Sequence, residues 1–423
     1  MRVSVAGLWH LGTVTAACCA QGGHDVTAFD EDSNVIEGLR DRRLPVDEPG
    51  LAELTASAVQ SGRLRFTSDA SALAESEILW ICHDTPVDEN DTADTEFVNA
   101  RVRKLLPYLP PKALVVISSQ LPAGSTARLN ETRPELTFAY SPENLRLGKA
   151  IEVFTKPDRV VVGLREGRGR ERLALLFAPF TDRIEWMSIE SAEMTKHALN
   201  AFLATSVAFI NEVATICEKT GADAQEVERG LKSDVRIGKG AYLHPGGAFA
   251  GGTLARDISF LVDLGKSHGV PTRLLKGVKE SNSEHNLWAR RRLFEIFGQL
   301  SGKGIAVLGL TYKPGTNTLR RSSSVEMCRW LVEQGSSVRA FDPAIREISG
   351  DLPGVELAAS GELALAGADA ALIATPWPEL RSIPPEAFVQ RMRRAVVLDP
   401  ARYMESVLQG ERQIEYFAIG VSR

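Results

Sequence analysis

The sequence predicts an α/β protein with two doubly wound parallel-sheet domains that are joined by a long helical central segment. Two observations support this fold class. Short β-branched runs alternate with amphipathic helical stretches in the first part of the chain, and the same alternation restarts near residue 305. Between the two parts, apolar residues recur at helical spacing over a long stretch.

The predicted strands of the first part are five short apolar runs, at residues 3–6, 26–29, 78–82, 114–118 and 160–162. A long helix is predicted over residues 191–220, where Met194, Phe202, Phe209 and Val213 recur at helical spacing. A glycine-rich segment follows at residues 239–252, and helical patterns resume up to residue 299. The second part supplies predicted strands at 305–310, 338–341, 371–375 and 395–398.

These elements divide the chain into three predicted domains. Residues 1–188 form an N-terminal Rossmann-like domain, and residues 189–300 form a helical central domain. Residues 301–423 form a C-terminal Rossmann-like domain. The Ser-Gly-Lys-Gly stretch at 301–304 marks the clearest boundary.

Composition restricts the class of protein. The chain has 423 residues, 44% hydrophobic and 24% charged, which is typical of a soluble globular protein. A formal net charge of −5 argues against a nucleic-acid partner. No run of eighteen apolar residues is present, so we expect no membrane segment and a cytoplasmic protein. The five cysteines form no C-x-x-C pair and are expected to be buried free thiols, and no metal site is predicted.

A dinucleotide-binding loop is predicted directly after the first strand. Gly7 and Gly12 fill the first and third glycine positions of the G-x-G-x-x-G fingerprint, but Trp9 occupies the second position. The indole either obstructs the pyrophosphate or points away from it. Asp30 ends the second strand 23 residues after Gly7, where a carboxylate can bind both ribose hydroxyls, so NAD is favoured over NADP. Alternatively, the two glycines serve only in turn formation and packing.

Further motifs follow in a specific order along the chain: Asp84-Thr-Pro-Val-Asp-Glu-Asn, Ser141-Pro-Glu-Asn-Leu-Arg, Lys156-Pro-Asp-Arg-Val-Val-Val-Gly, Glu193-Met-Thr-Lys-His-Ala-Leu-Asn, Arg236-Ile-Gly, Phe249-Ala-Gly-Gly and Gly309-Leu-Thr-Tyr-Lys-Pro-Gly-Thr. In this order they resemble the UDP-glucose and GDP-mannose dehydrogenase family over nearly the whole chain. Enzymes of this family oxidise the C6 alcohol of a nucleotide sugar twice, using two NAD and a covalent thioester.

The chain departs from the family's pattern at positions that carry chemistry. Thr253 stands at the family's catalytic cysteine, Leu147 replaces a second glutamate, and Gln120 replaces a threonine of the cofactor loop. Asn317-Thr318 replaces a pair of aspartates, although Arg320 remains. The resemblance therefore implies an atypical member that lacks the thiol.

The resemblance assigns catalytic roles to four other residues. Lys196, Asn200 and Asp257 match the lysine, asparagine and aspartate that activate water or hold the oxyanion, and Glu143 matches the general base. Lys196 and Asn200 are four residues apart, on one face of a helix, where they can stabilise alkoxide character. A solvated helix face is the alternative for this pair, and a helix cap is the alternative for Asp257.

Three functions remain open at this point. The first is a single two-electron alcohol oxidation, because an aldehyde has a hydride to give only after a nucleophile adds, and a threonine hydroxyl is a poorer nucleophile than a thiolate. The second is a redox-neutral, epimerase-like cycle with tightly held NAD. The third is a non-catalytic nucleotide-sugar-binding relative.

Binding residues are also predicted, some from their position in the chain and some from the resemblance. Thr85 and Gln120 line the cofactor cleft, and Thr85 could alternatively be part of a simple turn. Tyr242 and Phe249 contact a base or sugar, or else belong to the core. An arginine of the family that reaches a neighbouring subunit's ligand corresponds to Arg236, which implies a homodimer with the long helix as its interface. The remaining substrate-binding residues are Gly251, Lys313 and Arg320.

Overall fold

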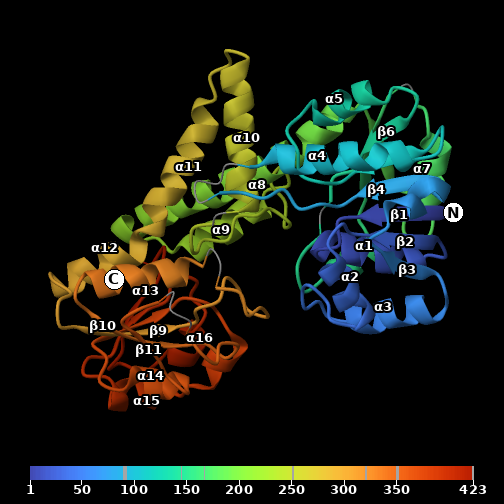
Figure 1. The fold of residues 1–423 in the computed structure, drawn as a ribbon. Coiled ribbons are helices and arrows are strands. Elements are labelled where there is room, and N and C mark those ends of the chain that lie inside the picture. Colours follow the sequence, from blue (N-terminus) through green and yellow to red (C-terminus); the bar gives the residue numbers. More distant parts are fainter. Residues whose placement is uncertain are drawn as a thin grey trace. The chain divides into compact units, whose positions relative to one another are not determined.

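The computed structural model describes residues 1–88, 93–143, 145–165, 167–249, 252–319, 322–348 and 352–421. Two compact units make up the chain, Met1–Leu199 and Asn200–Arg423, and Figure 1 colours them along the sequence. Each contains a parallel sheet, which confirms the predicted fold class. The division into three domains stays a prediction.

The first unit is built on an eight-stranded sheet with the order β3-β2-β1-β4-β5-β6-β7-β8. All neighbouring strands pair in parallel except β6 and β7, which are antiparallel. All five predicted strands are present, and β3, β6 and β8 were missed because they are four residues long and mix polar with apolar side chains. The strands are β1 (Arg2–Ala6), β2 (Asp25–Phe29), β3 (Leu64–Thr67), β4 (Ile78–Ile81), β5 (Leu114–Ile117), β6 (Thr137–Tyr140), β7 (Val160–Leu164) and β8 (Ile184–Met187).

Helices pack against this sheet, and α1 is the most deeply buried of them. Ten of the twelve α1 residues are buried because the helix is rich in alanine, cysteine and threonine and carries no charge at all in its buried part. The helices of the unit are α1 (His10–Gln21), α2 (Ser33–Arg40), α3 (Leu51–Gln60), α4 (Thr95–Leu105), α5 (Ser125–Thr132), α6 (Ala150–Thr155) and α7 (Arg170–Phe177), with short 3₁₀ turns η1 (Ala70–Glu75) and η2 (Leu106–Tyr108).

The long predicted helix is α8 (Ile189–Thr220), which continues from the first unit into the second. By length and composition it is also apolar enough to cross a membrane, although it contains no unbroken run of eighteen apolar residues. A core helix of a soluble protein passes the same test, and α8 carries the buried polar residues Glu193, Lys196 and Asn200. We therefore treat α8 as a helix of the folded protein, with one buried and one exposed face, and not as a membrane span.

The second unit combines helices with a six-stranded, wholly parallel sheet of order β11-β10-β9-β12-β13-β14. The three-residue strands β11 and β14 were missed by the sequence analysis. Helices α10 and α11 pack against each other as an antiparallel hairpin (Figure 1). The strands are β9 (Gly304–Leu308), β10 (Ser337–Phe341), β11 (Val355–Leu357), β12 (Ala370–Ile373), β13 (Val396–Leu398) and β14 (Glu415–Phe417). The helices are α9 (Ala224–Ser233), α10 (Thr253–Ser267), α11 (Arg273–Asn286), α12 (Trp288–Phe297), α13 (Ser323–Glu333), α14 (Gly361–Leu365), η3 (Pro378–Ser382), α15 (Pro385–Arg391) and α16 (Glu405–Leu408).

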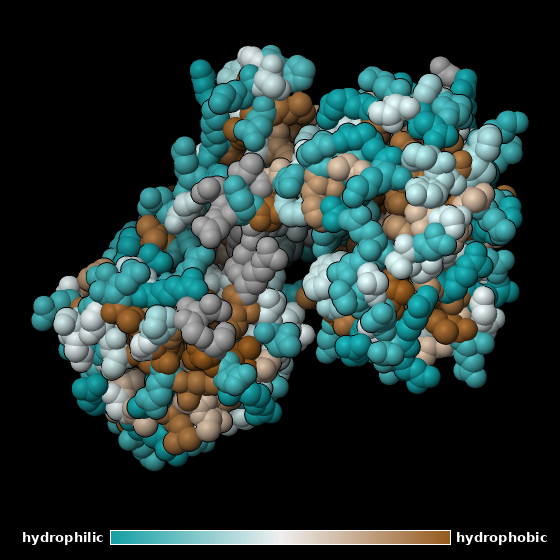
Figure 2. Space-filling model, viewed as in Figure 1, coloured by the Kyte–Doolittle hydropathy of each residue, from teal (hydrophilic) through white to brown (hydrophobic). Residues whose placement is uncertain are grey.

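The first strand of each sheet ends in the same loop geometry. Gly7 after β1 and Gly309 after β9 both have positive φ, +93° and +98°. In each unit the amide that follows the glycine donates to an aspartate at the end of the neighbouring strand: Leu8 to Asp30 at 2.8 Å, and Leu310 to Asp342 at 2.7 Å. The face in Figure 2 is mostly hydrophilic over both units, with smaller apolar areas between the polar side chains.

Candidate active site

The cofactor loop requires glycine at two of the three fingerprint positions. A Cβ on Gly7 would lie 2.5 Å from Nδ1 of His83, and a Cβ on Gly12 would lie 1.8 Å from the carbonyl oxygen of Gly7. Trp9, at the second position, has φ of −87°, which any residue adopts, and its side chain is 51% exposed. The loop therefore keeps the close approach of α1 to β1 without a second glycine.

Asp30 organises the same loop. One carboxylate oxygen accepts from the Leu8 amide at 2.8 Å, and the other accepts from the Asp32 amide at 3.1 Å. The residue is partly exposed, so its carboxylate remains available to a ribose. The first turn of α1 begins directly after the loop and contains no acidic residue, which leaves its amides suited to a pyrophosphate.

The strand ends beside this loop also fit a dinucleotide. The Thr85 hydroxyl donates to the Gln120 carbonyl at 2.7 Å and so links the loops that follow β4 and β5, as expected for a cleft edge. Nε2 of His83 and Oγ of Ser119 are buried and have no hydrogen-bond partner in the described part of the chain. Burial lowers the pKa of His83 to about 4, so the ring is neutral near pH 7. Unsatisfied polar groups at this edge are consistent with a polar ligand.

The first cluster of predicted catalytic residues lies in the first unit. The Lys196 ammonium donates to the Glu143 carbonyl at 2.5 Å and lies 3.6 Å from the Glu143 carboxylate. Lys196 is 5% exposed, so the alternative of a solvated helix face is wrong for this residue. The Glu143 side chain is 27% exposed, which leaves the carboxylate within reach of a ligand.

The second cluster of predicted catalytic residues lies in the second unit. The Asn200 amide donates to the Asp257 carboxylate, and both residues are buried. Asp257 is the fifth residue of α10 and cannot cap that helix, so the alternative of a capping role is wrong. Four residues earlier, Thr253 is exposed at the first position of α10, after Gly252 with φ of +119°. A helix N-terminus lowers the pKa of a thiol, but it does little for a threonine hydroxyl.

The five cysteines have environments that do not suit a catalytic thiol. All five cysteines are buried and free, as the sequence predicted. Burial raises the pKa of every one of these thiols, to about 12 for Cys18 and Cys328. A thiol with so high a pKa carries very little thiolate near pH 7. Among the described residues, there is also no cluster of three or more potential metal ligands.

The predicted substrate residues have different environments. Arg236 has an 85% exposed side chain and pairs with Asp234 at 2.7 Å. Tyr242 is 57% exposed and is therefore not a core residue, whereas Phe249 packs partly buried against the cluster around Ala201. Lys313 lies in a compact loop after β9, where its carbonyl accepts from the Thr316 hydroxyl at 3.0 Å. The predictions for Gly251 and Arg320 fall outside the described residues.

Two buried glutamates were missed by the sequence analysis. Glu193 accepts from the amides of Gly124 at 2.5 Å and Thr126 at 2.9 Å, and burial raises its pKa. Glu48 is 3% exposed and binds His10 as well as two backbone amides. Glu193 could have been found, because it precedes Lys196 by three residues and so lies on the same helix face. Glu48 gave no such signal, because a glutamate in a loop that contains proline and glycine is usually exposed to solvent.

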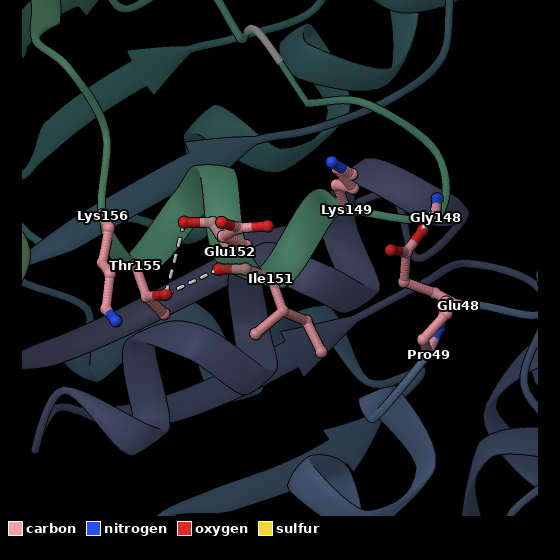
Figure 3. Close-up of a pocket in the computed structure, with 8 residues that line it drawn as sticks. All are labelled: Glu48, Pro49, Gly148, Lys149, Ile151, Glu152, Thr155 and Lys156. Carbon is pink, nitrogen blue, oxygen red and sulfur yellow. Dashed lines mark hydrogen bonds between the residues drawn. The ribbon is translucent and has the colours of Figure 1, made fainter.

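A hollow of about 320 Å³ lies beside Glu48, between the loop before α3 and helix α6. Figure 3 shows the Glu48 carboxylate next to Gly148, with the side chains of α6 along the opposite wall. Its wall carries residues of both charges: Glu48, Pro49, Gly148, Lys149, Ile151, Glu152, Thr155 and Lys156. This mixed lining does not favour an anion or a cation.

Three models of the UDP-glucose/GDP-mannose dehydrogenase family match the chain: the NAD binding domain at residues 1–181, the central domain at 190–284 and the UDP binding domain at 306–406. The UDP-glucose 6-dehydrogenase of Rhizobium meliloti is 34% identical over 99% of both chains. That of Pseudomonas aeruginosa is 32% identical over 100% of this chain and 98% of its own.

Solved structures of nucleotide-sugar dehydrogenases also superpose on this chain. The UDP-glucose dehydrogenase of Pyrobaculum islandicum superposes with a TM-score of 0.89 at 30% identity, over 100% of this chain and 98% of its own. A UDP-D-ManNAc dehydrogenase of Pyrococcus horikoshii gives a TM-score of 0.87 at 25% identity, over 99% of both chains. The likeness thus covers both sheets and the helices between them.

Proposed function

The chain belongs to the UDP-glucose/GDP-mannose dehydrogenase family of NAD-dependent enzymes, and from this premise we propose that it catalyses one two-electron oxidation of an alcohol on a nucleotide sugar or nucleotide. The observation that carries the proposal is Thr253, exposed at the start of α10 at the position of the family's cysteine. The product is an aldehyde or ketone rather than an acid.

The single oxidation needs a base and an acceptor for hydride. The C–H hydride passes to NAD when the cofactor is bound, the hydroxyl proton passes to a base, and the C–O single bond becomes a carbonyl. Glu143 is the proposed base, and its partner Lys196 stabilises the negative charge that develops on oxygen. Asn200 and Asp257 hold the oxyanion or a water molecule.

A second oxidation requires a tetrahedral adduct at the aldehyde carbon. Thiolate forms such an adduct readily, whereas the Thr253 hydroxyl would need a strong base beside it. The Thr253 side chain is exposed at the first position of α10 rather than enclosed beside a base. Leu147 in place of a second family glutamate removes one more group that could take up a proton.

On the substrate side, Lys313, Arg236 and Arg320 are proposed to bind the diphosphate, because cationic side chains attract an anionic ligand to a chain of net charge −5. Tyr242 is proposed to contact the base or sugar, since its ring is 57% exposed. Gly251 is proposed to let backbone approach the ligand. In the cofactor site, Gly7, Gly12, Asp30, Thr85 and Gln120 bind NAD, with Trp9 directed away from it.

We further propose a cytoplasmic homodimer. Phe202, Phe209 and Ile216 are 68%, 50% and 61% exposed and recur every seven residues on α8. A seven-residue repeat forms an almost straight stripe along a helix, which suits pairing with the same helix of a second copy.

The test is to incubate the purified protein with NAD and a panel of nucleotides and nucleotide sugars. NADH absorbance and product mass are followed together, with Lys196→Ala as the inactive control. One NADH per substrate and a product two mass units lighter support the proposal. Two NADH with an acid product would contradict it.

The same experiment separates the two competing functions. An isomerised product without net NADH, together with NAD that copurifies, would indicate the redox-neutral, epimerase-like cycle. NAD and nucleotide affinity without any product, in wild type as in Lys196→Ala, would indicate a binding protein. The Lys196–Glu143 and Asn200–Asp257 pairs favour chemistry, because a binding protein has no evident need for two such polar pairs with Lys196, Asn200 and Asp257 buried.

A further inference from the structure

Glu48 connects two loops that are far apart in the sequence. Its Oε2 accepts from Nε2 of His10 at 2.9 Å and from the amide of Gly148 at 2.8 Å, and its Oε1 accepts from the amide of Ala150 at 2.8 Å. The Glu48 side chain is 1% exposed. A buried carboxylate with three donors is held firmly, and it fixes the donors in turn.

The donors belong to the two halves of the proposed site. His10 is the first residue of α1 and lies inside the cofactor loop, between Gly7 and Gly12. Gly148 and Ala150 end the loop that begins at Glu143 and start α6. In that loop, the Glu143 carboxylate accepts from the Leu145 amide at 2.8 Å. A path of hydrogen bonds thus runs from the cofactor loop to the loop of the proposed base.

Apolar packing supports the same connection. The buried side chains of Val14, Ala17 and Cys18 on α1 form one cluster with Leu51 and with Ala150 at the start of α6. Leu145 and Ile151 pack against this cluster as well. A shift of the first turn of α1 therefore cannot occur without a response from the segment 145–151, because packed interiors transmit displacement.

We propose that His10 and Glu48 are positioning residues that couple occupancy of the NAD site to the order of the segment 145–150. Bound NAD orders the cofactor loop and the start of α1. Glu48, which is hydrogen-bonded to His10, then holds the amides of Gly148 and Ala150 more firmly in place. The nucleotide-sugar site then gains affinity when NAD is bound, and NAD gains affinity by the same factor when the substrate is bound. The link to the substrate rests on the proposed function.

Hydrogen exchange of the full chain, with saturating NAD and no substrate, tests the coupling. In wild type, NAD should slow exchange of the amides in 145–155 roughly fivefold or more, the size of an ordinary coupling between sites. In His10→Leu, NAD should still protect residues 7–22, but protection of 145–155 should fall below about twofold. His10→Gln keeps a donor for Glu48 and should restore the protection.

His24→Leu is the matched control. His24 is also buried in the first unit, and its Nε2 donates one hydrogen bond to the Leu176 carbonyl at 3.1 Å, away from the cofactor loop. It should retain the full response of 145–155. If His10→Leu does not fold, Glu48→Gln makes the same test, because its amide nitrogen cannot accept from the loop.

The outcomes are distinct from those of the turnover experiment. The inference is overturned if wild type shows no NAD-dependent protection of 145–155, or if His10→Leu and Glu48→Gln keep it. Turnover without coupling would leave the proposed function intact and remove this inference. Coupling without turnover on any nucleotide sugar would support this inference and contradict the proposed function.

Discussion

At the residue scale, Gly12 shows how tightly α1 is held against β1. A methyl group at this position would lie 1.8 Å from the Gly7 carbonyl oxygen, so α1 or the loop must shift in Gly12→Ala. We expect NAD to bind at least tenfold more weakly, equivalent to about 1.4 kcal/mol, as measured by calorimetric titration. Gly38→Ala is the control, because its Cβ in α2 meets its nearest neighbour at an ordinary 3.5 Å. Equal NAD affinity in both variants would contradict the prediction.

Thr253 offers a direct test of the missing thiol. In Thr253→Cys, the helix N-terminus should lower the pKa of the new thiol below its usual value of about 8.5. We expect NADH per substrate to rise from one towards two, and alkylation of the thiol to proceed at lower pH than in Ser267→Cys. Ser267 is the last residue of the same helix, where the dipole has the opposite sign. A Thr253→Cys protein that still forms one NADH, and whose thiol reacts like that of Ser267→Cys, would contradict the proposal that Thr253 limits the reaction to one oxidation.

Sequence reasoning at this scale succeeded where spacing determines geometry. Gly7, Gly12 and Asp30 follow from the strand-loop-helix pattern. Lys196 and Asn200 were assigned by the resemblance, their four-residue spacing placed both on one face of a helix, and both are buried. Glu48 could not be found in the same way. Its three donors come from segments 38 to 102 residues away, and no local pattern encodes such a contact.

At the element scale, α8 has two different faces. Lys196, Asn200 and Asn211 are buried on one side, whereas Phe202, Phe209 and Ile216 are exposed. The sequence predicted this helix over 191–220 and the structure gives Ile189–Thr220, because a 32-residue helix shows its period clearly. Strands of three or four residues, such as β11 and β3, are too short to show the two-residue alternation of a strand.

The exposed stripe of α8 leads to a prediction about assembly. Phe202→Glu combined with Phe209→Glu should convert a dimer to a monomer, because each substitution would bury a carboxylate in an apolar interface. Light scattering coupled to size-exclusion chromatography measures the mass. Leu175→Glu, on α7 and 61% exposed, is the matched control and should leave the mass unchanged. A monomeric wild type, or a double variant that stays dimeric, would contradict the proposed interface.

At the scale of the whole molecule, each unit has an aspartate that accepts a hydrogen bond from the loop after its first strand, but the two aspartates differ in burial. Asp30 is partly exposed, whereas Asp342 is buried and its Oδ2 accepts from Leu310, Thr311 and the Trp377 indole. A carboxylate enclosed in this way cannot receive a ribose. The sequence predicted two similar domains, but it did not reveal this difference, since Trp377 lies 35 residues beyond Asp342.

Buried histidines give the whole molecule a defined response to acid. Burial lowers the pKa of His24 and His83 in the first unit and of His285 in the second. A histidine with a lowered pKa in the folded state binds protons better when unfolded, so stability is lost as pH falls below about 6.5. Each such histidine contributes at most about 1.4 kcal/mol per pH unit. Buried Glu193 and Asp399 act in the opposite direction, because burial raises their pKa.

The contribution of one histidine can be isolated with His285→Gln. Nε2 of His285 lies 2.7 Å from the Gly246 carbonyl and donates to it, and a glutamine amide can make the same donation without binding a proton. We therefore expect the free energy of unfolding of wild type relative to His285→Gln to fall progressively between pH 6.5 and 5, as measured by urea denaturation. His268→Gln, at the exposed end of α10, should run parallel to wild type over this range. If the wild-type and His285→Gln curves were also parallel, protonation of His285 would be the same in the folded and unfolded chains, and its burial would have no part in the acid response.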